Sequence, residues 1–162
     1  MAFLFNDDLV RLHVLAASDG QSAQRLKMRV VMAVRRYAAR LVCRAVDAGE
    51  AFEILSKKTR EIARRARITA MMSGYFGRVK VECGVYPFPD CDYADMRLAR
   101  GDYRAVRVSI GKGAGHNWWC VLYPELCAVE QSVAEVLMGS GSVEFYSSIA
   151  QFFENLLSVV GL

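Results

Sequence analysis

Two histidines and five cysteines are the residues of this 162-residue chain that could perform nucleophilic chemistry. His116 and Cys120 lie four positions apart, and His13 is the second histidine. A thiol becomes an effective nucleophile when an imidazole lies within hydrogen-bonding reach and accepts its proton. Residues four apart on a strand are about 13 Å distant, so this pair needs a turn between its members. One interpretation is therefore a cell-envelope hydrolase that uses Cys120 with His116 or His13.

The cysteines also allow disulfides. They are Cys43, Cys83, Cys91, Cys120 and Cys127. No CxxC spacing indicates a zinc ribbon or a thioredoxin-type motif. Cys120 and Cys127 flank a proline that can fold the chain back, and they are a candidate disulfide if the protein is exported. Cys83 could pair with Cys91 or remain a buried free thiol, and Cys43 is most simply a small helical residue.

A group of polar residues surrounds the end of the first expected strand. Arg11 and His13 share the strand face opposite the expected core, and Ser18 and Asp19 follow the strand. These four side chains either hold the start of the next helix through hydrogen bonds or form a polar site at the strand end.

Trp118 and Trp119 are adjacent in an expected strand. Adjacent strand residues point to opposite faces, so burying both requires that both faces be covered. We expect one tryptophan to pack in the core and the other to be an exposed anchor for a partner, with His116 and Asn117 beside it.

The sequence indicates no cofactor site. The glycine-rich segment 111–115 lacks the GxGxxG and GxxxxGK[ST] spacings of phosphate-binding loops, so we expect a turn there. No HxxxH or HExxH motif occurs. We expect no metal, no cofactor, no small-molecule substrate and no nucleic acid, because a net charge of +4 is too small for the last.

The hydrophobic period predicts a strand followed by two helices. Residues 9–16 alternate as a strand. We expect Ser18 to cap the first helix in a capping box with Gln21, and Asp47 to cap the second. Both helices carry an apolar stripe at intervals of three and four. The stripe residues are Leu26, Val30, Val34, Tyr37 and Leu41 in the first helix, and Phe52, Leu55, Thr59, Ile62 and Ala66 in the second.

From Val79 the period changes to two, which indicates strands. The first is expected to be stopped by Pro87 and Pro89, a second spans 103–110, and a third follows the glycine-rich segment. The β-α-α-β-β-β order predicts an α+β fold, a small, mostly antiparallel sheet with a helical hairpin packed on one face. We expect a single domain over residues 1–128, a linker over 129–142 and an amphipathic helix over 143–162.

Composition limits the class of protein. The chain is 54% hydrophobic and 23% charged, which is enough apolar material for a core. A basic run between Lys57 and Arg67 is most simply a solvated helix face; the alternative is a module that binds cell wall or a membrane surface. No apolar run is long enough to span a membrane. No signal peptide is visible, so the protein either stays inside or its true start lies upstream.

Two segments resemble the stage II sporulation protein R family. The first is Val10–Asp19, followed by a helix with Leu26, Lys27, Arg29 and Val30. The second runs from Asp102 to Gly111 and then from Asn117 to Cys127, with two tryptophans, two cysteines and a proline at fixed spacing. The resemblance covers roughly residues 9–128.

The resemblance implies a signalling protein and not an enzyme. A member of this family is made in the forespore and is exported into the space between the forespore and the mother cell. There it activates a membrane-embedded aspartic protease, which cleaves the precursor of sigma-E. The exported environment favours the Cys120–Cys127 disulfide. Trp118, Trp119 and the loop closed by this disulfide are then the expected partner-binding surface, with Arg11, His13 and Asp19 beside it.

Overall fold

The computed structural model describes residues 6–93 and 96–124. All described residues lie within one unit of the chain, Met1–Val129. The expected linker and C-terminal helix lie outside the described residues, and so does Cys127.

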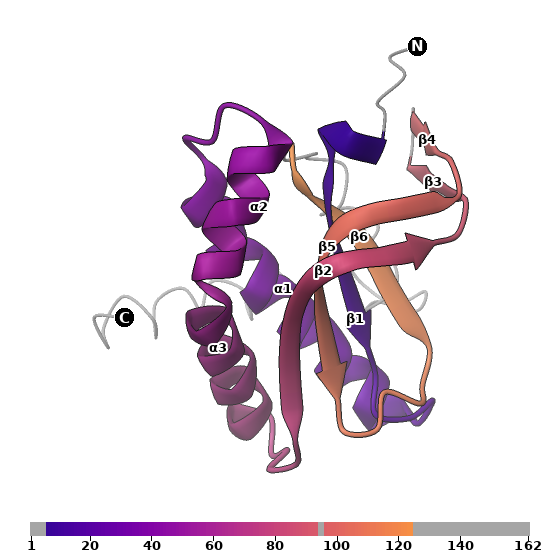
Figure 1. The fold of residues 1–162 in the computed structure, drawn as a ribbon. Helices are drawn as coiled ribbons and strands as arrows, with labels where there is room; N and C mark the ends of the chain where they lie inside the picture. The colour runs from indigo at the N-terminus through magenta and orange to yellow at the C-terminus, as the bar shows by residue number, and fades with distance from the viewer. Residues whose placement is uncertain (1–5, 94–95, 125–162) are drawn as a thin grey trace, which may run out of the picture. The chain divides into compact units, whose positions relative to one another are not determined.

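The described elements form a mixed sheet with helices on one side (Figure 1). In chain order they are η1 (Asn6–Asp8), β1 (Val10–Leu15), α1 (Gln21–Val42), α2 (Ala48–Lys57), α3 (Thr59–Met72), β2 (Val79–Phe88), β3 (Cys91–Tyr93), β4 (Met96–Leu98), β5 (Gly101–Ile110) and β6 (Asn117–Tyr123). The sheet order is β2-β5-β1-β6, with β1 parallel to β5 and the other neighbours antiparallel. The predicted α+β class and mostly antiparallel sheet are confirmed.

The second predicted helix is two helices, because the chain is interrupted at Lys58. Lys58 has φ −99° and ψ 10°, outside regular helix geometry. The Thr59 hydroxyl donates to the carbonyl of Ser56 at 2.8 Å. Such a local side-chain bond competes with the helical backbone pattern.

The two predicted helix starts differ in outcome. Asp47 caps α2, because its carboxylate accepts from the backbone N–H of Glu50 at 2.8 Å. The prediction that Ser18 caps α1 is wrong: Gly20 occupies the cap position and no side chain caps the helix. Ser18 and Asp19 lie in the preceding loop, where Asp19 is engaged by a distant residue instead.

Of the two prolines expected to stop this strand, Pro87 does not, because β2 continues to Phe88 and pairs Pro87 with Asp102 of β5, whereas the strand does end directly before Pro89. β2 is an edge strand of the sheet. Proline has no backbone N–H to donate. It is tolerated on an edge strand, where the side that would carry this N–H can face solvent and not another strand.

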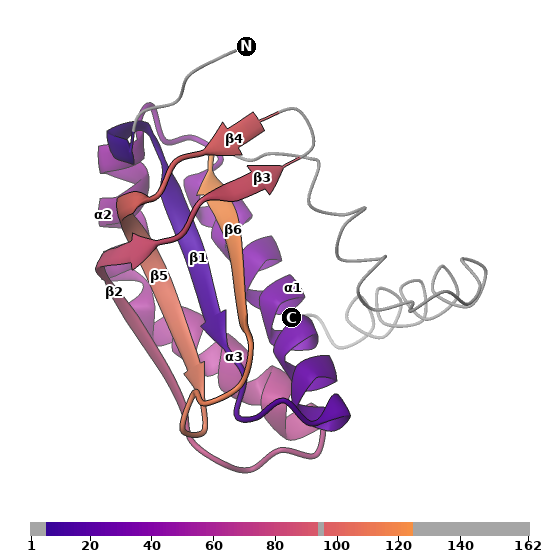
Figure 2. The ribbon, with the colours of Figure 1, turned by 90° about the vertical axis from the view of Figure 1, so that its right-hand side faces the viewer.

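The main core lies between the helices and one face of the sheet. Leu12 and Val14 of β1 are fully buried on this face, and Val34 of α1 and Ile62 of α3 are fully buried in the helix layer. On the other face, a smaller cluster forms around Phe88, with members Leu9, Phe88, Leu98, Tyr103, Ala105 and Val121. Leu98 belongs to β4, and Figure 2 shows the β3–β4 hairpin lying across one end of this helix-free face. The rest of the face carries no helix or strand among the described elements.

Candidate functional site: the Asp19–His116 junction

Two loops meet at one end of the sheet, one between β1 and α1 and the other between β5 and β6. Asp19 lies in the first loop and His116 in the second. One carboxylate oxygen of Asp19 accepts from the backbone N–H of His116 at 2.7 Å and lies 2.5 Å from its Nδ1. These two hydrogen bonds lower the pKa of Asp19, and the backbone one contributes most. Both side chains are exposed, so the junction is a surface feature.

Lys27 of α1 also binds the junction residue His116. Its side chain is buried, and its Nζ donates to the His116 carbonyl at 3.1 Å and to Gln24 Oε1 at 2.6 Å. Burial lowers the pKa of Lys27, while the nearby charge of Asp19 opposes this effect. Asp19 and Lys27 therefore bind both the N–H and the C=O of one residue, which fixes the backbone at His116.

Gly115 allows the two loops to approach each other. Its N–H donates to the Ala16 carbonyl at 3.0 Å. A Cβ at this position would overlap the backbone carbonyl of Ser18. Only glycine fits at this distance without displacing a loop.

The junction continues onto the helix-free face of the sheet through three side chains. His13 of β1 pairs across the sheet with Trp119 of β6, and the two rings stack with centroids 5.6 Å apart. Asn117 hydrogen-bonds His13. Burial lowers the pKa of His13 to about 4, and the charges of Arg107 and Arg11 act in the same direction. The structure thus brings together Asp19, His116, Asn117, His13 and Trp119.

The other two expected site residues of these strands are outside the junction: Trp118 is on the opposite face of the sheet, and Arg11 shares the Phe88 ring with His13. Trp118 pairs with the buried Val14 and faces the helix side of the sheet. Arg11 is fully buried, with its guanidinium 4.1 Å from the ring centroid of Phe88 and 4.9 Å from that of Tyr103. Both tryptophans are only half-buried, so the expected division into one core and one exposed ring is not what the structure contains.

Cys120 does not form a pair with either histidine. It is fully buried and pairs with Leu12, on the helix side of the sheet, whereas His13 faces the opposite side. Burial raises the pKa of the Cys120 thiol to about 11, which favours the unreactive protonated form. His116 is exposed and lies in the loop directly before β6. This geometry gives no support to the Cys–His hydrolase.

No two of the described cysteines form a disulfide with each other. Cys83 does not pair with Cys91; its Sγ lies 3.2 Å from the Thr59 hydroxyl, and burial raises its pKa. Cys43 is exposed. Cys120 is free among the described residues, and the Cys120–Cys127 disulfide stays a prediction because Cys127 lies outside them.

Sequence reasoning missed Lys27 and the closeness of the loops at Gly115. A signal for Lys27 existed, because it falls on the helical stripe formed by the buried Val31, Val34 and Ala38. A lysine on a buried stripe requires polar partners, which the sequence alone does not identify.

Within residues 6–93 and 96–124, no cluster of three or more His, Cys, Asp or Glu side chains could hold a metal ion. The helices of the same part of the chain include none long and apolar enough to cross a membrane.

Comparison with known proteins identifies the family. Residues 6–133 match the family of stage II sporulation protein R. Over 131 residues, or 81% of this chain, the sequence is 33% identical to stage II sporulation protein R of Bacillus subtilis (strain 168). The match spans 58% of that relative, so the chain corresponds to somewhat more than half of its length. No solved structure matches. The chain belongs to the stage II sporulation protein R family.

Proposed function

We propose that this protein is an exported signal of endospore formation. In this proposal it passes from the forespore into the space between forespore and mother cell. There it activates a membrane-embedded aspartic protease that cleaves the sigma-E precursor. Membership of the stage II sporulation protein R family over residues 6–133 is the observation that carries the proposal. A binding role also agrees with the burial of Cys120, which leaves its thiol without access to a substrate.

We place the protease contact at the Asp19–His116 junction. The junction is exposed and its backbone is fixed from two sides, by Asp19 and by Lys27. A fixed surface loses little conformational entropy when it binds a partner. Asn117 and the half-buried Trp119 extend this surface onto the helix-free face of the sheet. Trp118 faces the helix side of the sheet and is not included in the contact proposed here.

The experiment reconstitutes the signal in a cell that carries the cognate protease and the sigma-E precursor. The protein is expressed with an export signal, and precursor cleavage is followed by immunoblot. Cleavage that requires the exported protein supports the proposal. Absence of cleavage, with the protein shown to be folded and exported, contradicts it.

Variants locate the contact. His116→Ala and Asn117→Ala should reduce cleavage strongly, because both residues belong to the junction surface. Lys112→Ala is the matched control, since Lys112 is exposed in the same β5–β6 loop but makes none of the junction contacts. Equal cleavage by all three variants would remove the junction from the contact surface while leaving the signalling role intact.

A further inference from the structure

Helices α1 and α3 together carry ten of the 21 Lys and Arg residues of the chain and only one acidic residue. α1 contains six Lys or Arg residues and no acidic residue, and α3 contains four Arg residues and one acidic residue, Glu61. The whole chain has a net charge of only +4. The charge is therefore strongly polarised toward these two helices. Glu61, the one acidic residue of α3, accepts a hydrogen bond from Tyr37 and pairs with Lys58.

The arginines of α1 form one exposed row. Arg25, Arg29, Arg36 and Arg40 are exposed, and they follow each other at intervals of four, seven and four residues. These intervals place them on one side of a helix. Within the described part of the chain, Arg25 and Arg40 have no carboxylate partner.

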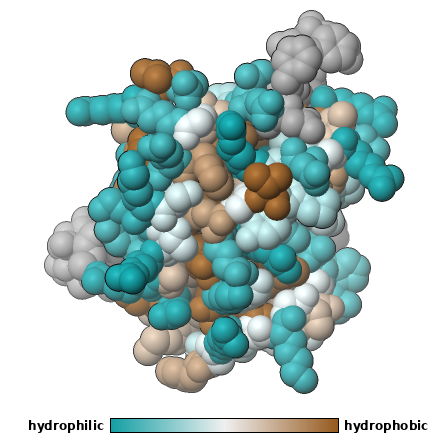
Figure 3. Space-filling view, viewed as in Figure 1, coloured by the Kyte–Doolittle hydropathy of each residue, from teal (hydrophilic) through white to brown (hydrophobic). Residues whose placement is uncertain are grey.

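Large apolar side chains are exposed among these arginines. Met32 lies within the row on α1 and is 43% exposed. Ile68, Met71 and Met72, at the end of α3, are 42%, 53% and 62% exposed, and their spacing puts them on one face. Phe76, in the loop after α3, is 79% exposed. In Figure 3, brown surface reaches the outside at the lower end of the molecule, below α3.

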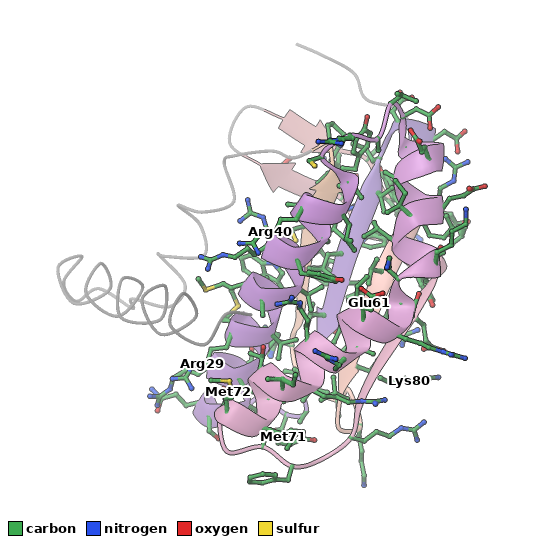
Figure 4. The ribbon with its side chains drawn as sticks, turned by 90° about the vertical axis from the view of Figure 1, so that its left-hand side faces the viewer. Arg29, Arg40, Glu61, Met71, Met72 and Lys80 are labelled. Carbon is green, nitrogen blue, oxygen red and sulfur yellow. The ribbon has the colours of Figure 1, made fainter. Side chains whose placement is uncertain are left out.

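The two helices present these side chains together. Arg29 of α1 donates to the Ser73 hydroxyl at the end of α3, at 3.3 Å. Figure 4 looks onto the helix layer and shows Arg29 and Met72 next to each other, with Met71 nearby. We call this group the arginine–methionine surface; its members are Arg25, Arg29, Met32, Arg36, Arg64, Ile68, Met71, Met72 and Phe76.

We propose that the arginine–methionine surface binds an anionic phospholipid bilayer. The arginines attract lipid phosphates, and the methionine, isoleucine and phenylalanine side chains enter the boundary between headgroups and acyl chains. The exposed apolar residues favour a bilayer over a polar polyanion such as a cell-wall polymer, because only the bilayer has an apolar interior in which these side chains can be buried. This surface lies on the helix side of the sheet, whereas the contact proposed for the protease continues onto the opposite side. The inference does not depend on the proposed signalling function.

The test is sedimentation of the purified full chain with vesicles. One set contains equal parts of phosphatidylglycerol and phosphatidylcholine, and the other contains phosphatidylcholine alone. The protein should sediment with the anionic vesicles and should not bind the neutral ones. Binding to the anionic vesicles should weaken when salt is added. Equal binding to both sets, or to neither, would overturn the proposal.

Two pairs of variants test the two parts of the surface. Arg25→Gln with Arg64→Gln should weaken binding about fivefold for each arginine removed. Met71→Ser with Met72→Ser should weaken it about tenfold, because two apolar side chains no longer enter the bilayer. All four positions are exposed, so the fold should persist, and circular dichroism checks this.

Matched controls are taken from other parts of the molecule. Arg97→Gln with Arg100→Gln removes the same charge at exposed positions in and just after β4, on the helix-free face. Val46→Ser with Val85→Ser removes exposed apolar side chains. Both controls should bind like the unchanged protein. A different result would reject insertion into a bilayer. If the methionine variant binds vesicles and heparin as well as the unchanged protein does, and the arginine variant loses vesicle binding, the partner is a polyanion or an acidic protein.

Discussion

Asp19 and His116 are 97 positions apart in the chain, yet one carboxylate oxygen of Asp19 contacts both the backbone N–H and the ring of His116. The contact joins the loop that starts α1 to the loop that starts β6. Both loops lie at the same end of the sheet, so these hydrogen bonds fix the two loops to each other. Its strength and its pH response can be measured separately from the global stability.

We predict that Asp19→Ala opens the junction while the fold persists. The amide of His116 loses its acceptor, so its hydrogen exchange should become about tenfold faster or more. In the unchanged protein this protection should be present at neutral pH and should disappear in acid, as pH falls through the lowered pKa of Asp19. Hydrogen exchange followed by NMR measures both effects. Asp102→Ala, at an exposed position in β5, is the control and should leave the His116 amide protected.

Gly115→Ala should destabilise the protein, because the added Cβ meets the backbone of Ser18 and not a movable side chain. We expect the free energy of unfolding to fall by about 1–3 kcal/mol in urea denaturation. Gly20→Ala is the comparison within the same junction, since its Cβ would lie 3.5 Å from its nearest neighbouring atom, Ser18 Oγ. That variant should cost less than about 1 kcal/mol. Equal losses in the two variants would mean that the approach at Gly115 is not a close one in solution.

His13 should make stability depend on pH. Its pKa is about 4 in the folded protein against 6.5 for an ordinary histidine, so between these values the unfolded chain binds a proton that the folded chain does not. Stability should therefore rise with pH across this window, by about 1–2 kcal/mol for a ring that is only partly buried. Urea denaturation at pH 5 and at pH 7 gives the difference.

His13→Gln should reduce this difference, whereas Lys112→Gln, at an exposed position outside the junction, should leave it nearly unchanged. The comparison between the two variants matters because carboxylates also titrate near the lower end of the window. The same pH difference in both variants would show that His13 is not held neutral by burial.

Features set by neighbouring residues could be predicted from the sequence. The alternation in β1 correctly separates Leu12 and Val14 from His13, because strand side chains alternate whatever the rest of the fold does. Asp47 was recognisable as a cap because its bond partner, Glu50, lies three residues away. The partner-dependent features could not be predicted in this way. Ser18-Asp19-Gly20-Gln21 has the pattern of a capping box, but Asp19 is engaged by His116 and the helix starts later, after Gly20.

Several residues singled out from the sequence lie together in the structure, but the sequence did not predict how they are arranged. His13, Asp19, His116, Asn117 and Trp119 were all singled out, and the structure brings them together at one end of the sheet. Which tryptophan belongs to them depends on the register between β1 and β6, and register depends on pairing across the whole sheet. The burial of Arg11 depends on Phe88 and Tyr103, which come from two other strands.

Cys120 should resist alkylation in the native protein. Its side chain is fully buried and its pKa is raised to about 11, so both access and the thiolate fraction are low. Cys43 is exposed and should react with iodoacetamide under the same conditions, which makes it an internal control. Peptide mass spectrometry measures both sites. Rapid native labelling of Cys120 would contradict the buried position and would make the hydrolase interpretation worth testing. Labelling after denaturation without reductant indicates a free thiol, whereas labelling that also requires reductant indicates a disulfide, with Cys127 as the expected partner.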